Sequence, residues 1–275
     1  AHHRILFHED ITGKEITSHL LNAVKKLKNV RMYEYTTLLD ILCDGSKCCG
    51  GIIRWPDGRE EQVEADYVIL ATGGIGGTYK HSTNFKHLTG DGVEIARRHN
   101  IELKNLDYVQ IHPTTLYSDN KEERSFLISE SVRGEGARLY DKNMNRFVDE
   151  LLPRDLLTQE IYKQMEKDGT DFVWEDLRTI PRDELISHFP NIIEHCSQAG
   201  YDVFHECIPI VPAQHYFMGG IKVNHNSKTS MDHLYAVGET ACNGVHGKNR
   251  LASNSLLESL VFAKRAAKEI AGERR

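Results

Sequence analysis

Two side chains able to bind a carboxylate stand where packing alone does not require them. His112 precedes Pro113, which restricts the His112 backbone to extended conformations and so helps to aim the imidazole. Taken alone, this histidine also fits a purely structural role. Arg154 follows Pro153 at a predicted helix start, where a positive charge opposes the helix dipole. Binding an anion is one reason for an arginine there.

Two further groups of the same kind come later in the chain. His215 lies in a stretch rich in proline and glycine, residues 209–220, at a predicted domain junction. Arg250 lies beside the start of the last predicted helix, and its planar guanidinium suits bidentate binding of a carboxylate. Three cap-type residues follow at 253–255, of which helix capping explains only one. Together these four groups supply the cations and donors that a dianionic ligand needs.

Two glycine-containing stretches leave their roles open. Residues 129–137 hold two acids, an arginine and two glycines, which indicates either a binding loop or a turn with internal ion pairs. Residues 73–77 follow a predicted buried strand, but no convincing helix follows them. A phosphate-binding turn normally leads into a helix N-terminus, so this stretch is a weak signal for phosphate binding.

The elements that must position these residues follow two different patterns. The first part of the chain predicts a helix, two extended runs, a hairpin with Asp-Gly at its turn, and a buried strand, at 14–28, 30–35, 38–43, 51–59 and 67–71. The middle predicts mainly helices, at 154–167, 181–188 and 191–199. A buried strand at 234–238 and a helix at 255–271 then resume the first pattern.

The fold class that this order predicts is α/β, with a Rossmann-like domain interrupted by an α+β domain. The predicted boundaries are 1–108 for the first part, 109–217 for the inserted domain and 218–275 for the second part.

Composition excludes several classes of function. The 275 residues are 40% hydrophobic and 27% charged with a net charge of -6, which argues against nucleic acid as a partner. No apolar run approaches the ~18 residues of a membrane span, and Ala1–Arg4 is too polar to open a signal peptide. Scattered cysteines favour a reducing cytoplasm. Cys43, Cys48 and Cys49 lack paired C-x-x-C spacing, so we expect no metal site.

Several motifs in combination resemble one flavoprotein superfamily, that of succinate dehydrogenase, fumarate reductase and L-aspartate oxidase. The resemblance runs from Arg4–Leu6 and Asp10–Gly13 to the final helix and rests on Ala71–Gly74, Thr89–Gly92, His112–Thr114, Arg133–Gly136, Pro153–Asp155, His215–Tyr216, His246–Gly247 and Asn249–Arg250. Two stretches, 251–258 and 188–190 with 211–216, look more like the L-aspartate oxidases than the respiratory enzymes. Lys248 departs from the pattern, which usually has alanine there.

The resemblance implies an FAD-binding domain split around a capping domain, with a four-carbon dicarboxylate between them. It implies FAD contacts from Asp91, Glu239, Ser255 and Leu256, with the turn Ala71, Thr72, Gly73 and Gly74 close by. It implies substrate contacts from His112, Thr114, Glu130, His215 and Arg250. Arg154 matches the proton-transfer residue.

The implied reaction passes hydride from the α-carbon of L-aspartate to flavin N5 and gives iminoaspartate. Oxygen or fumarate would reoxidise the flavin, and quinolinate synthase would take the product toward NAD. The alternative is a fragment of a fumarate reductase or succinate dehydrogenase flavoprotein, acting on fumarate or succinate. The N-terminal glycine-rich FAD motif and the C-terminal helical domain of the superfamily are not in the sequence. We therefore expect a truncated fragment that binds FAD weakly or not at all and is itself inactive.

Overall fold

The computed structural model describes residues 7–8, 11–120 and 124–273, and these form two compact units. Unit 1 comprises the described residues of 1–26, 79–86 and 111–215, and unit 2 comprises 27–78, 87–110 and 216–273. The inserted unit thus begins and ends within two residues of the expected 109 and 217. The described residues of 1–26 and the segment 79–86 were expected in the first part of the other domain, but they group with the inserted unit. Arg4–Leu6 and Asp10 lie outside the described residues.

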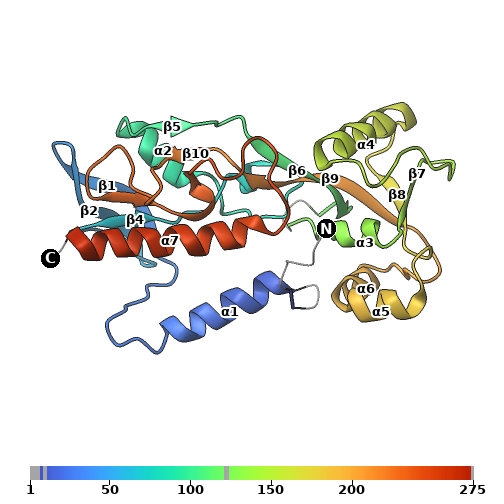
Figure 1. Cartoon of the computed structure of the whole chain (residues 1–275), viewed down its shortest axis with the longest axis horizontal. Coiled ribbons are helices and arrows are strands. Elements are labelled where there is room, and N and C mark those ends of the chain that lie inside the picture. The colour runs from blue at the N-terminus through green and yellow to red at the C-terminus, as the bar shows by residue number, and fades with distance from the viewer. Residues whose placement is uncertain (1–6, 9–10, 121–123, 274–275) are drawn as a thin grey trace. The chain divides into compact units, whose positions relative to one another are not determined.

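Unit 1 contains a four-stranded sheet in the order β6-β9-β8-β7. Its strands are β6 (Val109–Leu116), β7 (Arg138–Tyr140), β8 (Val173–Asp176) and β9 (Ile208–Phe217). Its helices are α1 (Thr12–Val24), α3 (Glu130–Gly134), α4 (Arg154–Asp168), α5 (Arg182–His188) and α6 (Pro190–Gln198). Figure 1 shows α4 on one side of β7 and β8, and the α5–α6 pair on the other.

One hydrophobic core joins these layers. It includes Leu139 of β7, Ile161 of α4, Ile192 of α6 and Ile208 of β9, all at most 2% exposed. Because helices cover the sheet, β8 and β9 are buried along nearly their whole length. Because both faces of these strands are buried, no alternation of buried and exposed residues marks them in the sequence.

Unit 2 contains three small sheets, with strand orders β1-β2-β3, β12-β10-β5 and β11-β4. The strands are β1 (Thr37–Asp44), β2 (Lys47–Arg54), β3 (Glu60–Glu64), β4 (Val68–Leu70), β5 (Leu103–Lys104), β10 (Gly220–Lys222), β11 (Leu234–Ala236) and β12 (Ala241–Cys242). The helices are α2 (Asp91–Arg98) and α7 (Asn254–Glu273), with short 3₁₀ turns η1 (Gly76–Thr78) and η2 (Gly238–Thr240). Figure 1 draws α7, the long C-terminal helix, in red.

The structure confirms most predicted elements and corrects one. The hairpin turn at Asp57-Gly58 joins antiparallel β2 and β3, and the runs at 67–71 and 234–238 form the parallel pair β4–β11. β11 is buried as predicted, whereas Ile69 of β4 is 45% exposed. The run 30–35, predicted as extended, forms no strand. Tyr35 there has φ 55° and is 89% exposed, so neither its backbone conformation nor its burial suits a strand.

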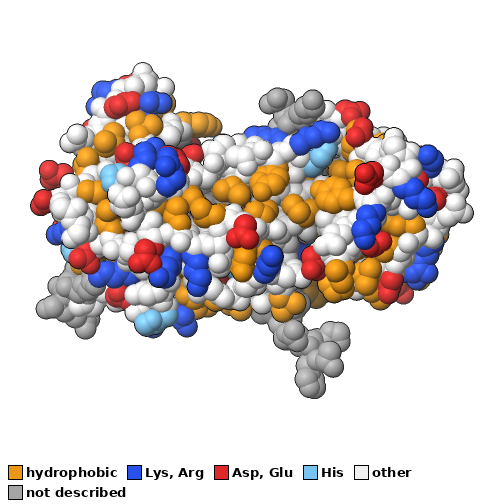
Figure 2. Space-filling model, turned by 90° about the horizontal axis from the view of Figure 1, so that it is seen from above, with side chains coloured by type: hydrophobic (Ala, Val, Ile, Leu, Met, Phe, Trp, Pro, Cys, Tyr) orange, Lys and Arg blue, Asp and Glu red, His pale blue; other side chains and the backbone are white. Residues whose placement is uncertain are grey.

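The distribution of charged side chains on the surface matches the composition. On the face shown in Figure 2, basic and acidic side chains are intermixed, as the modest net charge suggests. Among the residues that the structure describes, no helix is both long enough and apolar enough to cross a membrane.

Gly220 provides a test of the packing in unit 2. Its φ is 130°, and a Cβ on residue 220 would lie 2.3 Å from the carbonyl oxygen of Thr240. Gly220→Ala should therefore lower the free energy of unfolding by more than about 1 kcal/mol, measured by urea unfolding. Gly272→Ala, where a Cβ meets nothing within 4 Å, is the matched control and should not destabilise the protein. Equal unfolding curves for the two variants would contradict the packing described.

Candidate functional site

Strand β6, at the edge of the sheet of unit 1, carries His112 and Thr114, and both are buried. His112 is 1% exposed, and its Nδ1 lies 3.0 Å from the carbonyl oxygen and 3.2 Å from the nitrogen of Thr114. Its Nε2 makes no hydrogen bond to any described residue. The Thr114 hydroxyl donates to the carbonyl oxygen of Ile128 at 3.0 Å. His112 thus keeps one nitrogen for a ligand or water, whereas the Thr114 hydroxyl already has an acceptor.

His215 lies close to His112, with 5.3 Å between the ring centroids. Thr83 positions it, because the Thr83 hydroxyl is 2.8 Å from His215 Nδ1. Asn84 Nδ2 donates to the His215 carbonyl oxygen at 3.1 Å and to Gln214 Oε1 at 2.8 Å. These supporting residues were missed in the sequence, where the polar run 82–84 after the glycine-rich turn was the available signal.

Arg154 and Glu130 form an ion pair in unit 1. Arg154 is the first residue of α4, as the Pro153 signal predicts, and its side chain is 10% exposed. Its Nε and one terminal nitrogen donate to Glu130 Oε2 at 2.9 and 2.6 Å. Glu130 opens α3 and is 47% exposed. The structure therefore connects the stretch 129–137, predicted as either a binding loop or a turn with internal ion pairs, to Arg154 through one charged pair.

A second arginine, Arg133, adds positive charge nearby. It is 2% exposed, and one terminal nitrogen donates to the Glu150 carbonyl oxygen at 2.7 Å. Burial holds the pKa of His112 well below its usual range, and His215, Arg154 and Arg133 lower it further. The imidazole of His112 is therefore neutral near pH 7. It offers a hydrogen bond in a desolvated, cation-rich environment without a charge of its own.

In unit 2, two turns lie next to each other at the carboxyl ends of parallel strands. The turn at 71–74 follows β4 and the turn at 237–240 follows β11, its direct neighbour. The carboxylate of Glu239 accepts a hydrogen bond from the Phe217 nitrogen at 2.8 Å. A Cβ on Gly74 would lie 2.4 Å from Glu239 Oε1, so only glycine permits this approach. Ligands of open α/β sheets bind outside the carboxyl ends of such strands.

The start of α2 packs against the same turns. Thr72 Oγ1 donates to Thr240 Oγ1 at 2.9 Å, and a Cβ on Gly92 would come within 2.2 Å of Thr72 Oγ1. Asp91 is exposed at the N-terminus of α2 and accepts from Thr89 Oγ1 at 2.7 Å. The motifs at 71–74 and 89–92, separate in sequence, thus share one location.

The segment before α7 holds Arg250, which is 4% exposed. Its guanidinium carbon lies 4.9 Å from the centre of the Tyr216 ring, and a terminal nitrogen is 3.3 Å from Ser255 Oγ. Leu256 is 38% exposed, and Lys248 is also exposed. Arg250 and Ser255, predicted for substrate and cofactor, are therefore direct neighbours.

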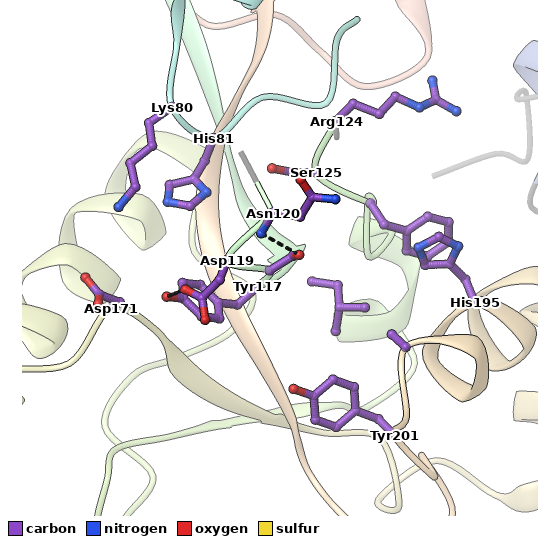
Figure 3. Close-up of a pocket in the computed structure, with 14 residues that line it drawn as sticks. Lys80, His81, Tyr117, Asp119, Asn120, Arg124, Ser125, Asp171, His195 and Tyr201 are labelled. Carbon is purple, nitrogen blue, oxygen red and sulfur yellow. Dashed lines mark hydrogen bonds between the residues drawn. The ribbon is translucent and has the colours of Figure 1, made fainter. Parts of the chain in front are cut away.

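A cavity of about 650 Å³ in unit 1 contains none of the predicted site residues. In Figure 3, Lys80, His81 and Asp171 line one side, and Arg124 and His195 the other. Its two lysine or arginine side chains are offset by two aspartates. Sequence motifs gave no indication of this cavity, and its mixed charge favours no ligand class.

A family model described as an FAD binding domain matches residues 2–256. The chain belongs to this family of FAD-binding domains. The predicted fold class and cofactor, FAD, are therefore confirmed at the level of the family.

Individual relatives show which members of this family the chain is similar to. The L-aspartate oxidase of Clostridium perfringens is 53% identical over 267 residues, covering 97% of this chain and 61% of that protein. The L-aspartate oxidase of Bacillus subtilis is 40% identical and covers 96% of this chain and 50% of that protein. Among solved structures, a quinol-fumarate reductase with menaquinol molecules matches with a TM-score of 0.88 at 34% identity, covering 98% of this chain and 50% of that chain. The chain thus spans about half to three fifths of the proteins it resembles.

The residues at the turns after β4 and β11, and at the start of α2, fit part of FAD. Asp91 and Glu239 offer carboxylates, which accept hydrogen bonds, so they suit hydroxyl and N–H groups and repel phosphates. The glycines at 73 and 74 let the backbone come close to a ligand. Burial raises the pKa of Glu239 to about 7, opposed by the Phe217 N–H and by Arg250. A donor from a bound cofactor would favour the ionised form.

The raised pKa of Glu239 predicts how stability depends on pH. In the unfolded chain this carboxyl ionises near its ordinary pKa of 4.5, but in the folded chain only near 7. Between pH 4.5 and 7 the carboxyl therefore ionises mainly in the unfolded state, which favours unfolding. By pH values above 7 this lowers the free energy of unfolding by about 3 kcal/mol in all. Glu239→Gln should be more stable than the unchanged protein at pH 8 but not at pH 4, measured by urea unfolding.

Glu64→Gln is the control for this prediction, because it removes an exposed carboxylate of the same unit. It should shift the unfolding midpoint by similar small amounts at both pH values. If Glu239→Gln behaved in the same way as this control, the buried carboxyl would not carry the pH dependence.

Proposed function

We propose that this chain is part of an FAD-dependent enzyme that oxidises L-aspartate to iminoaspartate, with oxygen or fumarate as electron acceptor. Two relatives named L-aspartate oxidase, 53% and 40% identical, align with at least 96% of the chain. The observation that carries the proposal is the cation-rich cluster of His112, His215, Arg154 and Arg133 in unit 1. A desolvated cluster of this kind suits a dicarboxylate.

Substrate orientation is the first role that we assign to unit 1. Neutral His112 donates or accepts through Nε2, and His215 beside it supplies a second imidazole. Glu130 is half exposed, so its carboxylate can accept from an α-ammonium group while it stays paired with Arg154. Fixing both ends of the substrate supplies the orientation that hydride transfer requires. FAD, when bound, would accept that hydride.

Arg154 is the proposed proton-transfer residue. An arginine gives up a proton only where its charge is strongly disfavoured, because its ordinary pKa exceeds ~12. Arg133 brings a like charge near Arg154, whereas Glu130 at 2.6 Å pairs with it. Glu130 therefore holds the guanidinium in place, where it can exchange a proton with the substrate.

Unit 2 would hold the cofactor and would supply one more side chain that binds the substrate. We assign Asp91, Glu239, Ser255 and Leu256 to FAD, together with Ala71, Thr72, Gly73 and Gly74. Arg250 is the proposed carboxylate ligand from this unit, and its buried guanidinium over Tyr216 supports that role.

The second candidate is a fumarate reductase or succinate dehydrogenase flavoprotein, favoured by the match to a quinol-fumarate reductase at TM-score 0.88. Peroxide released with L-aspartate but not with succinate would favour the first proposal, and the reverse would favour the second. In the first case quinolinate synthase would consume the product, as a step toward NAD. The six free cysteines fit a reducing compartment such as the cytoplasm.

Arg154→Lys in the complete natural protein tests the proposal. Lysine keeps one positive charge but loses the planar pair of donors to Glu130, so aspartate-dependent peroxide release should fall at least ~10²-fold. FAD content, read from the flavin absorbance of the purified protein, should not change, because Arg154 lies in unit 1.

Arg182→Lys is the matched control, since Arg182 also opens a helix of unit 1 but stacks on Phe204 at 4.0 Å. It should retain full turnover. Unaltered turnover in Arg154→Lys would remove Arg154 from the mechanism, whereas loss of both turnover and FAD would indicate a structural role.

A further inference from the structure

The hairpin of β1 and β2 places two cysteines opposite each other. Cys43 and Cys48 are paired across the antiparallel strands, next to the turn that joins Asp44 to Lys47. The Cys48 nitrogen donates outside the hairpin, to the carbonyl oxygen of Asp232 at 2.9 Å. An outward N–H is typical of a non-hydrogen-bonded pair, in which side chains lie closest, with Cα atoms ~4.5 Å apart. A disulfide requires ~4.4–6.8 Å between Cα atoms.

A bulge adds a third thiol beside this pair. Leu42 pairs with Gly50 and Cys43 with Cys48, so Cys49 has no partner residue of its own on β1. A bulge of this kind sets two residues opposite one. Cys48, not Cys49, is nevertheless the residue in register with Cys43.

Cys43 also has an acceptor for its proton. Its Sγ lies 3.5 Å from His99 Nδ1, and His99 Nε2 lies 2.7 Å from Asp40 Oδ1. Because the Asp40 carboxylate can only accept, it favours the tautomer with hydrogen on Nε2. That tautomer leaves Nδ1 with a lone pair facing the thiol. Carboxylate, imidazole and thiol thus form a chain of the kind that activates cysteine nucleophiles.

Exposure gives the two cysteines different roles. Cys43 is exposed, so a small oxidant in solvent can reach it, whereas Cys48 is completely buried behind it. Cys196 and Cys242 are also buried, and Cys207 is half buried with a contact to Arg178. None of these three faces another thiol across a strand pair.

We propose that Cys43 and Cys48 form a dithiol site that hydrogen peroxide oxidises to a disulfide. The Cys43 thiolate, its proton taken by His99, attacks one peroxide oxygen. An S–O bond forms, the O–O bond breaks, and the leaving hydroxide takes the proton from His99 as water. The Cys48 thiol then attacks the resulting sulfenic sulfur. The S–S bond forms and the second oxygen leaves as water, so two thiols and one peroxide give one disulfide and two waters.

The surroundings of the site set its sensitivity. Burial, the neighbouring Cys48 and Cys49 thiols and Asp40 raise the pKa of Cys43. Arg98, which is 3.4 Å from Asp40, offsets part of the negative charge beside it. The thiolate is therefore a minor species at neutral pH, so oxidation requires peroxide in excess. The proposal does not depend on the proposed activity, although an oxidase would itself release peroxide.

Lys47 makes the disulfide directly measurable. Trypsin cuts after Arg31, Lys47 and Arg54, which puts Cys43 on peptide 32–47 and Cys48 with Cys49 on peptide 48–54. The chain is treated with hydrogen peroxide, free thiols are blocked with an alkylating agent, and the non-reducing digest is analysed by mass spectrometry. Peptides 32–47 and 48–54 should appear as one linked species that a reductant separates.

Variants assign the bond within the linked species. Cys43→Ser and Cys48→Ala should each abolish it, whereas Cys49→Ala should retain it. His99→Gln should slow its formation severalfold while leaving the far-ultraviolet circular dichroism spectrum unchanged. Cys43→Ser changes an exposed residue, so it preserves the test even if Cys48→Ala fails to fold. An unlinked digest of the unchanged protein, a bond between Cys48 and Cys49, or a link lost in Cys49→Ala would overturn the proposal.

Discussion

The parallel pairing of β4 with β11 is the constraint on which unit 2 depends. Three residues of each strand pair, and the strands run in the same direction. Parallel neighbours cannot be joined by a tight turn, because the chain must return to the starting end before the second strand begins. The connection between β4 and β11 therefore has no short solution, and here it includes all of residues 111–215. Because loop-closure entropy grows only slowly with length, a whole inserted unit is a tolerable connection.

The same pairing explains why the cofactor motifs come together. Both strands end at the same edge, so the turns that follow them, with Thr72 and Thr240, are brought into hydrogen-bonding contact. Buried strands and glycine turns are local signals, and these were predictable from the sequence. Which turn lies beside which depends instead on the parallel sheet that the order of strands and helices implies.

Other parts of the site could not be predicted because their causes are not local. Thr83 and Asn84 position His215 through contacts between segments far apart in the chain. In the sequence, Arg133 is one residue of a charged stretch, but in the structure it is buried and donates a hydrogen bond to the Glu150 carbonyl oxygen. The extended run at 30–35 had the right composition for a strand but no neighbour to pair with. Strand formation depends on that neighbour as much as on the run itself.

The close approach of Gly74 to Glu239 links these positions in evolution. A side chain at residue 74 and a carboxylate at 239 would occupy the same space, and residues 92 and 72 stand in the same relation. The glycine of each pair cannot be replaced first, since a larger residue would displace its partner before a second replacement could compensate. Among homologous sequences these positions should therefore stay fixed or change together. A natural sequence with a larger residue at 74 should also carry a shorter one at 239.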